Sequence, residues 1–200
     1  MKTITGVFIR HGFSQANQAL RIAGVTDIDL TIPGIEELEV IKEKQLFPAT
    51  DLYFCSPMKR TRTTFKTLLG EKDHTVFLDE FKELDFGDLE WELFEKADLP
   101  DLFSKWYDNQ TRDNVENQVD FTQRITAGLN EILTSCTNDN AQSFTLVSHS
   151  CVMRQIIHIF QPLTKEEFLN YHIANGHGFI AQITYDETNN QITKTSLQYV

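Results

Sequence analysis

The sequence has few cysteines and no long hydrophobic run, and both scarcities narrow what the protein can be. Its 200 residues include 3 cysteines, Cys55, Cys136 and Cys151, an odd number without the CxxC spacing of metal and redox motifs. We therefore expect reduced thiols and a cytoplasmic protein. No run of about 18 apolar residues occurs, so we expect no membrane-spanning helix. The first apolar run stops at Arg10, which is unlike a secretory signal.

Basic residues are also scarce. The chain has 18 Lys and Arg against 29 Asp and Glu, a formal net charge of −11, and the segment 71–120 holds the whole acidic excess. That segment is typical of a solvated helical face. An acidic surface repels nucleic-acid phosphates, so we expect no nucleic-acid partner. On the same ground, a strongly acidic substrate is the least favoured one.

Apolar segments alternate with helical patterns along the chain, which predicts an α/β fold. The length suits a single domain over residues 1–200, and 40% hydrophobic residues suffice for its core. The patterns predict strands at 3–9, 51–55, 75–78 and 144–148, and a C-terminal hairpin of 179–185 and 192–199 with its turn at 186–190. They predict helices at 32–47, 58–69, 90–107, 119–133 and 151–160, and a loop at 108–118.

Two of the predicted strands lead directly into a histidine. Arg10-His11-Gly12 follows the first strand, and His149 follows the strand 144–148. Ligands of open α/β sheets bind beyond the carboxyl ends of the strands, so the two histidines can share one crevice. Helix N-termini at this edge would offer free N–H groups to an anion.

Four short motifs hold residue types suited to a phosphoryl group: 10–12 with Ser14 and Asn17, 56–60, 83–87 and 148–150. Arginine binds phosphoryl oxygens with a planar fork that keeps its charge. A neutral imidazole can attack phosphorus, while a second imidazole, arginines and an Asn amide can hold the charge that develops on the oxygens. A carboxyl group beside the phosphate can protonate the leaving oxygen.

These motifs resemble, in order, those of the histidine phosphatase superfamily, also called the phosphoglycerate mutase-like family. Arg10-His11-Gly12 with Ser14 and Asn17 resembles the opening motif, and 29–31 with Gly34 the segment that follows it. Residues 56–60 with Thr64 resemble the family's second-arginine motif. Residues 83–88 resemble its acid motif, and residues 148–149 resemble its second-histidine motif. A lone Arg-His-Gly is weak evidence, whereas the ordered set from residue 4 to about 155 is specific.

The resemblance implies a three-layer α/β/α fold with a mostly parallel mixed sheet, and we expect a lid-like helical insertion at about 88–120. It implies that His11 is the nucleophile that becomes phosphohistidine and that Glu83 is the proton donor. Arg10, Arg60 and His149 would bind the phosphoryl oxygens. It also implies no metal and no other cofactor, and the sequence has no spacing typical of metal ligands.

Four further residues are expected to bind substrate. The resemblance implies Asn17 as a secondary contact, and Ser14, Arg21 and Ser150 are further candidates, although a surface role suits Arg21 equally well. Two positions depart from the family: Phe13, where an acid is usual, and Ser150, where glycine is usual. A side chain at Ser150 can narrow the pocket or donate a hydrogen bond, so the natural substrate stays open.

Several neighbouring residues have simpler interpretations. Asp85 and Glu90 compete with Glu83 for the role of the acid. Arg62 follows Arg60 by two residues and would face away from it on a helix. The remaining titratable residues match no catalytic motif and are interpreted as structural or packed: His74, His158, His172, His177 and Cys151.

We therefore expect a metal-independent phosphatase that hydrolyses a small-molecule phosphomonoester through phosphohistidine. The alternative is a phosphoglycerate mutase, which must also bind a substrate carboxylate and keep water from its phosphoenzyme. Family mutases are usually longer, with basic residues after the acid motif, whereas that region is the most acidic here. A further alternative is a non-catalytic protein that binds a phosphorylated ligand. Such a protein would be expected to lack a catalytic residue, and none is missing here, so this alternative is less favoured. The oligomeric state stays open.

Overall fold

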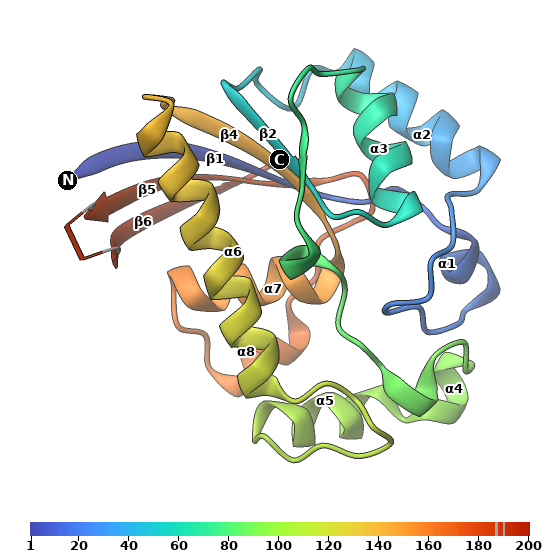
Figure 1. Cartoon of the computed structure of the whole chain (residues 1–200). Helices are drawn as coiled ribbons and strands as arrows, with labels where there is room; N and C mark the ends of the chain where they lie inside the picture. Colours follow the sequence, from blue (N-terminus) through green and yellow to red (C-terminus); the bar gives the residue numbers. More distant parts are fainter. Residues whose placement is uncertain (187, 190) are drawn as a thin grey trace.

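The computed structural model has one six-stranded sheet at the centre of the protein (Figure 1). It describes residues 1–186, 188–189 and 191–200. The strands are β1 (Lys2–Arg10), β2 (Leu52–Cys55), β3 (Val76–Phe77), β4 (Ser143–Ser148), β5 (Gly178–Asp186) and β6 (Gln191–Tyr199). They lie in the order β3-β2-β4-β1-β5-β6, parallel from β3 to β1 and antiparallel from β1 to β6. The sheet is mixed and mostly parallel, as predicted.

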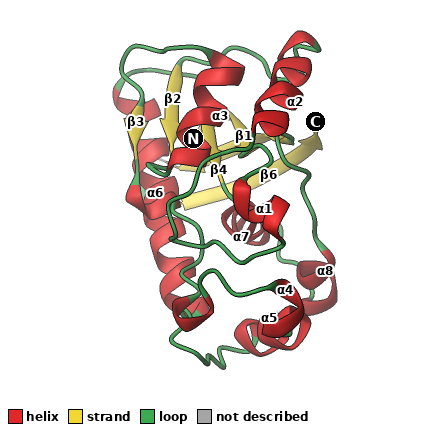
Figure 2. Ribbon diagram, turned by 90° about the vertical axis from the view of Figure 1, so that its right-hand side faces the viewer, coloured by secondary structure: helices red, strands yellow, loops and turns green. Residues whose placement is uncertain are grey.

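Helices cover both faces of the sheet and complete the three layers (Figure 2). One face carries α2 (Ile32–Glu43) and α3 (Lys59–Leu69), and the other carries α6 (Gln118–Asn138) and α7 (Ser150–Phe160). The other helices are α1 (Gln15–Ala19), α4 (Phe94–Ala97), α5 (Leu99–Tyr107) and α8 (Lys165–Asn170), and two 3₁₀ turns span Asp79–Phe81 and Gly87–Leu89. Figures 1 and 2 both show α4 and α5 together at one end of the molecule, beyond the sheet.

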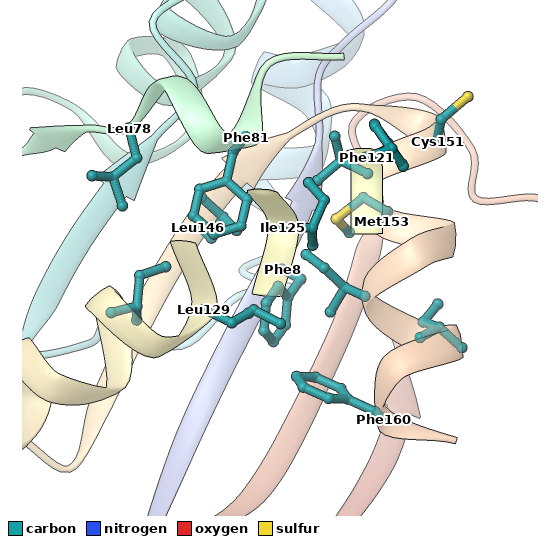
Figure 3. Packing of buried hydrophobic residues seen from close by; sticks show 14 of the residues in the cluster. Phe8, Leu78, Phe81, Phe121, Ile125, Leu129, Leu146, Cys151, Met153 and Phe160 are labelled. Atoms are coloured by element: carbon teal, nitrogen blue, oxygen red, sulfur yellow. The ribbon is translucent and has the colours of Figure 1, made fainter. Parts of the chain in front are cut away.

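Alternating side chains of β1 contribute to two hydrophobic cores. Ile4 and Phe8 belong to the core beneath α6 and α7, whereas Val7 and Ile9 belong to the core beneath α2 and α3. Successive residues of a strand point to opposite faces, so both faces of β1 are buried. Figure 3 shows Phe8 among the side chains of α6 and α7 in the larger core.

Most predicted elements are present, with changes at their ends. Thr31 caps α2 through its hydroxyl, which accepts a hydrogen bond from the Gly34 N–H, and Gly70 ends α3 with a φ of 75°. The helix predicted to reach residue 47 ends at Glu43, and the helix predicted to end at residue 133 continues to Asn138. The predicted turn 186–190 falls partly outside the described residues, because 187 and 190 are not described.

The helix predicted at 90–107 is instead two short helices, α4 and α5. Asp98 separates them in a left-handed conformation with φ 44° and ψ 60°. Its carboxylate then caps α5 by accepting from the Asp101 N–H at 3.4 Å. Pro100 lies in the first turn of α5. Backbone N–H groups of the first turn have no acceptor within the helix, so the missing N–H of proline costs no hydrogen bond there. The role of the segment 88–120 as a lid stays a prediction.

Candidate active site

A pocket of about 160 Å³ lies where the ends of β1 and β4 meet the starts of α1 and α7. It brings together all but one of the predicted site residues, namely Arg10, His11, Ser14, Asn17, Arg21, Arg60, Glu83 and Ser150. The exception is His149, which is fully buried and whose ring centre lies 5.3 Å from that of His11.

His11 has one ring nitrogen available to a ligand. Its Nδ1 lies 2.8 Å from the carbonyl oxygen of Gly12, which only accepts, so Nδ1 carries the proton and Nε2 the lone pair. Nε2 has no hydrogen-bond partner among the described residues. Burial, together with Arg60 and Arg10, lowers the pKa of His11 well below its ordinary value. The ring is therefore neutral at neutral pH.

The amide of Asn17 is held so that its nitrogen stays available. Its Oδ1 accepts from the Ser14 N–H at 3.0 Å and from Nδ2 of Asn175 at 3.3 Å, while Nδ2 of Asn17 has no partner in the described part of the chain. Ser14 also caps α1 through its hydroxyl. Asn175, which was not predicted, donates further to the carbonyls of His11 at 3.0 Å and Gly12 at 3.2 Å. It thereby fixes the backbone of the opening motif.

Arg60 is held by several hydrogen bonds and is 1% exposed. Its Nη1 donates to the Thr26 carbonyl at 2.9 Å, Nη2 to the Gly24 carbonyl at 2.6 Å, and Nε to Nδ1 of His149 at 3.1 Å. Nε2 of His149 lies 2.8 Å from the hydroxyl of Ser56. Burial, followed by the charge of Arg60, lowers the pKa of His149 well below its ordinary value. Both ring nitrogens are engaged within the protein, so direct contact between His149 and a phosphoryl group stays a prediction.

Glu90 organises the loop that holds Arg60. Its carboxylate accepts from the N–H groups of Gly24 at 3.0 Å and Thr26 at 3.1 Å, and also from the hydroxyl of Thr26. Gly24 is needed for this close packing, because a Cβ there would lie 2.0 Å from the carbonyl oxygen of Leu84. Glu90 is absent from the pocket lining, so its contacts assign it a structural role.

Glu83 is the one acidic side chain among the described residues that line the pocket, and it is 5% exposed. Its Oε1 accepts from the N–H groups of Cys151 at 3.1 Å and Val152 at 3.3 Å, in the first turn of α7. The sequence predicts free N–H groups for an anionic ligand at such helix ends. This prediction is wrong for the N–H groups of Cys151 and Val152, because both donate to the carboxylate of Glu83. Asp85 lies outside the lining, where its carboxylate accepts from the Gly87 N–H at 2.8 Å.

The pocket is positively charged although the protein is acidic. Four arginines line it together with Glu83: Arg10, Arg21, Arg60 and Arg154. Beyond Glu83, the acidic segment 71–120 contributes only aromatic and aliphatic side chains to the lining: Phe86, Phe94, Leu99 and Phe103. The net charge of the protein therefore does not describe this pocket, whose own charge favours anionic ligands.

Two arginines lie near the edge of the pocket. Nη1 of Arg21 donates to the Trp91 carbonyl at 2.6 Å, and its guanidinium lies over the Trp91 ring. Arg154, which was not predicted, lies one helical turn after Ser150 on α7. The signal that could have found it is this spacing of four residues, which places both side chains on one face of the helix.

The remaining candidates lie apart from this pocket or are inert. Arg62 is absent from the pocket lining, and its guanidinium lies over the Phe77 ring. The histidines predicted as structural, His74, His158, His172 and His177, do not line it either. Cys151 does line it, but burial raises the pKa of its thiol, which keeps the thiol protonated.

Within the described ranges of the chain, no three His, Cys, Asp or Glu side chains are grouped so that they could hold a metal ion. No helix of these ranges is long and apolar enough to cross a membrane.

Comparison with known proteins identifies the family. The model of the histidine phosphatase superfamily (branch 1) matches residues 7–197. The chain belongs to this superfamily. The three-layer fold and the order of motifs predicted from the sequence agree with that membership.

Relatives within the histidine phosphatase superfamily differ in activity. An adenosylcobalamin/alpha-ribazole phosphatase of Escherichia coli is 27% identical over 179 residues, 84% of either chain. A 2,3-bisphosphoglycerate-dependent phosphoglycerate mutase of Rhizobium rhizogenes is 27% identical over 202 residues, 92% of either chain. The structure of a mycobacterial glucosyl-3-phosphoglycerate phosphatase has a TM-score of 0.79 at 16% identity, over 99% of this chain and 98% of that one. The last likeness concerns the fold alone.

Proposed function

We propose that the protein is a metal-independent phosphatase that hydrolyses small phosphomonoesters through a phosphohistidine at His11. The observation that carries this proposal is Nε2 of His11, a ring nitrogen that holds its lone pair and has no hydrogen-bond partner in the described chain. A neutral imidazole in that state is a nucleophile for phosphorus. Arg10 and Arg60 line the same pocket and supply positive charge for the phosphoryl oxygens.

The reaction has two steps. In the first, Nε2 of His11 bonds to phosphorus while the ester P–O bond breaks, and Glu83 gives its proton to the leaving oxygen. In the second, water attacks the phosphohistidine, Glu83 accepts the proton of the water, and inorganic phosphate leaves with Nε2 restored. Arg10, Arg60 and the free amide nitrogen of Asn17 stabilise the charge on the phosphoryl oxygens in both steps.

Access for water favours hydrolysis over phosphate transfer. Leu99, Phe103 and Arg154 line both the pocket and a groove of about 630 Å³, so the groove lies next to the pocket. A mutase has to keep water from its phosphoenzyme until the second substrate oxygen attacks. A large hollow next to the pocket is better suited to an enzyme in which water is the second reactant.

The release of inorganic phosphate from a panel of phosphomonoesters tests this proposal. Arginines supply here the charge that Mg²⁺ supplies in many phosphoryl-transfer enzymes, so turnover should survive exhaustive chelation. Vanadate should inhibit because it imitates the phosphoryl group. Loss of activity with a chelator, reversed by a divalent ion, would contradict the metal-independent mechanism.

A second assay separates phosphatase from mutase. The protein is given 3-phosphoglycerate with 2,3-bisphosphoglycerate as primer, and both free phosphate and 2-phosphoglycerate are measured. Net phosphate release should outpace isomerisation. Rapid isomerisation with little free phosphate would identify a mutase instead.

A further inference from the structure

The loop between α8 and β5 is bound to the backbone of the opening motif. β5 pairs antiparallel with β1, so the residues just before β5 lie beside those just after β1. The Gly176 N–H donates to the carbonyl of Arg10 at 3.1 Å and to that of His11 at 3.2 Å. The Arg10 N–H donates in turn to the His177 carbonyl at 2.9 Å. These bonds place the side chain of Asn175 beside His11.

The carbonyl of Gly12 determines which ring nitrogen of His11 is free. It lies 2.8 Å from Nδ1 and accepts the proton of that nitrogen, which leaves the lone pair on Nε2. If this carbonyl turned away, Nδ1 would lose its acceptor, and the neutral ring could carry its proton on Nε2 instead. A protonated Nε2 has no lone pair with which to attack phosphorus. The direction of the Gly12 carbonyl is therefore a requirement of the proposed reaction.

Glycine by itself holds this carbonyl poorly. Without a Cβ, its backbone dihedral angles are less restricted than those of other residues. A larger residue does not fit at position 12, because a Cβ there would lie 2.7 Å from Cδ1 of Leu38. The Gly12 N–H donates to the hydroxyl of Thr64 at 2.9 Å, but this bond holds the peptide that precedes Gly12 and not the one that contains its carbonyl. The carbonyl therefore needs a donor from elsewhere.

Asn175 is that donor. Its Nδ2 lies 3.2 Å from the carbonyl oxygen of Gly12, 3.0 Å from that of His11 and 3.3 Å from Oδ1 of Asn17. In the described part of the chain, Nδ1 of His11 and Nδ2 of Asn175 are the groups that donate to the Gly12 carbonyl. The His11 carbonyl, by contrast, also accepts from the Gly176 N–H. Loss of the Asn175 amide would thus release the Gly12 carbonyl in particular.

We propose that Asn175 is a positioning residue for the nucleophile: it holds the Gly12 carbonyl, which keeps the proton of His11 on Nδ1 and the lone pair on Nε2. This inference rests on the proposed function, because it concerns the same His11. Asn175 does not line the pocket, so it acts through its neighbours. When Nε2 bonds to phosphorus, the ring becomes a cation and its Nδ1–H a stronger donor, so a carbonyl already in place stabilises that charge.

Two variants distinguish a hydrogen-bond donor from a side chain that only fills space. Asn175→Asp keeps nearly the same shape, but at about pH 8 its carboxylate cannot donate and repels the acceptor oxygens. Asn175→Ala removes the donor without adding an acceptor. With saturating p-nitrophenyl phosphate, phosphoenzyme formation should slow about 10-fold in Asn175→Ala and about 100-fold in Asn175→Asp. A space-filling role predicts the opposite order, because aspartate preserves the volume.

The ring of His11 gives a more direct readout. In protein with isotope-labelled histidine, the nitrogen NMR shifts show which ring nitrogen carries the proton, and the signals missing from His11→Asn identify those of His11. The wild-type ring should carry its proton on Nδ1. Both Asn175 variants should populate the form with the proton on Nε2, which a change in stability alone would not produce.

Asn140→Ala is the matched control for lost stability. Asn140 is exposed, has a φ of 52° and precedes β4, whereas the pocket lies at the other end of that strand. Alanine is strained in this left-handed conformation, so the variant should unfold at a lower urea concentration. Its rate of phosphoenzyme formation and its His11 tautomer should equal those of the wild type.

The outcomes separate the inference from the proposed function. An unchanged tautomer in both Asn175 variants would overturn the inference and leave the phosphatase standing, and so would a loss of rate in Asn175→Asp no larger than in Asn175→Ala. A wild-type ring with its proton on Nε2 would do the same without any variant. A wild-type protein that forms no phosphohistidine at His11 would instead overturn the proposed function, and the inference with it.

Discussion

The Nε–H of Arg60 donates to Nδ1 of His149 over 3.1 Å. A guanidinium cannot accept a hydrogen bond, so this contact leaves Nδ1 of His149 without a proton and places the proton of the neutral ring on Nε2. Nε2 in turn donates to the hydroxyl of Ser56 at 2.8 Å. His149 therefore orients the guanidinium of Arg60 through Nε, while the carbonyls of Thr26 and Gly24 accept from its Nη1 and Nη2.

Replacing Arg60 by lysine tests whether this orientation matters beyond charge. Arg60→Lys keeps the positive charge but cannot reach His149 and the two carbonyls together. We expect the rate of phosphoenzyme formation to fall about 10²–10³-fold, the range for losing one oxyanion donor. Rapid-quench measurement with p-nitrophenyl phosphate gives this rate. Ser56→Ala, which removes only the acceptor for His149, should cost about tenfold. A fully active Arg60→Lys variant would show that charge alone suffices.

Three carboxylates near the acid motif should respond differently to amide substitution. Glu83→Gln removes the proton for the leaving oxygen, so phosphoenzyme formation from an alkyl phosphate should slow by about 10²–10⁴-fold. With p-nitrophenyl phosphate, whose leaving group needs little protonation, the loss should be smaller. Glu90→Gln disturbs the loop that holds Arg60 and should slow both substrates alike.

Asp85→Asn is the control in this series, because Asp85 lies outside the pocket lining and accepts from the Gly87 N–H. It should leave the leaving-group dependence unchanged. If Asp85→Asn or Glu90→Gln showed the selective loss with alkyl phosphates while Glu83→Gln did not, the wrong carboxylate has been assigned.

The central part of the fold was predictable because its patterns are local and repeated. The buried strands that become β1, β2 and β4, and the amphipathic helices between them, have periodicities that sequence alone displays. The break at Asp98 was missed because the apolar spacing of 94–106 continues across it, whereas the left-handed residue and Pro100 interrupt the backbone. The short helices α1 and α8 were missed although each starts with a capping box, at Ser14 and Thr164.

Sequence motifs predicted which residues meet in the pocket only where those residues belong to a motif. Arg10, His11, Arg60 and Glu83 line one pocket, as their motifs imply. Asn175 was missed because its role depends on which distant segments meet: it donates to the His11 carbonyl from far along the chain. Arg154 was missed although its spacing of four residues from Ser150 is a local signal. The charge of the pocket could not be predicted, since composition does not say which residues of an acidic segment face inward.

The stability of the fold should depend on pH through His11 and His149. Burial, with Arg60 next, lowers the pKa of both side chains in the folded protein, whereas the unfolded chain titrates them near about 6.5. Below that pH the unfolded state binds more protons, so the free energy of unfolding falls as the pH falls. Each histidine contributes up to about 1.4 kcal/mol per pH unit. Urea unfolding at pH 7.5 and 5.5 measures the loss. His11→Asn, which cannot titrate, should show a smaller loss than the wild type, and an equal one would contradict this account.

Gln155 offers a test of stability apart from catalysis. Its side chain is fully buried in α7, and neither its Oε1 nor its Nε2 has a hydrogen-bond partner among the described residues. A buried polar group without a partner costs about 1–3 kcal/mol, and methionine has nearly the same shape without that cost. Gln155→Met should therefore raise the urea midpoint. The control Gln123→Met, at an exposed position of α6, should shift stability by less than about 0.5 kcal/mol. A destabilised Gln155→Met variant would mean that the amide has a partner, such as a buried water.

The covalent intermediate on His11 is the central claim, and trapping it is the most direct measurement. The protein is mixed with a substrate labelled in the phosphoryl group, quenched, digested and mapped. The account predicts one labelled peptide containing His11, with a bond that is labile to acid and stable to alkali, as a phosphoramidate is. His11→Ala should give none. A label on a serine or a carboxylate, or full labelling of His11→Ala, would contradict it.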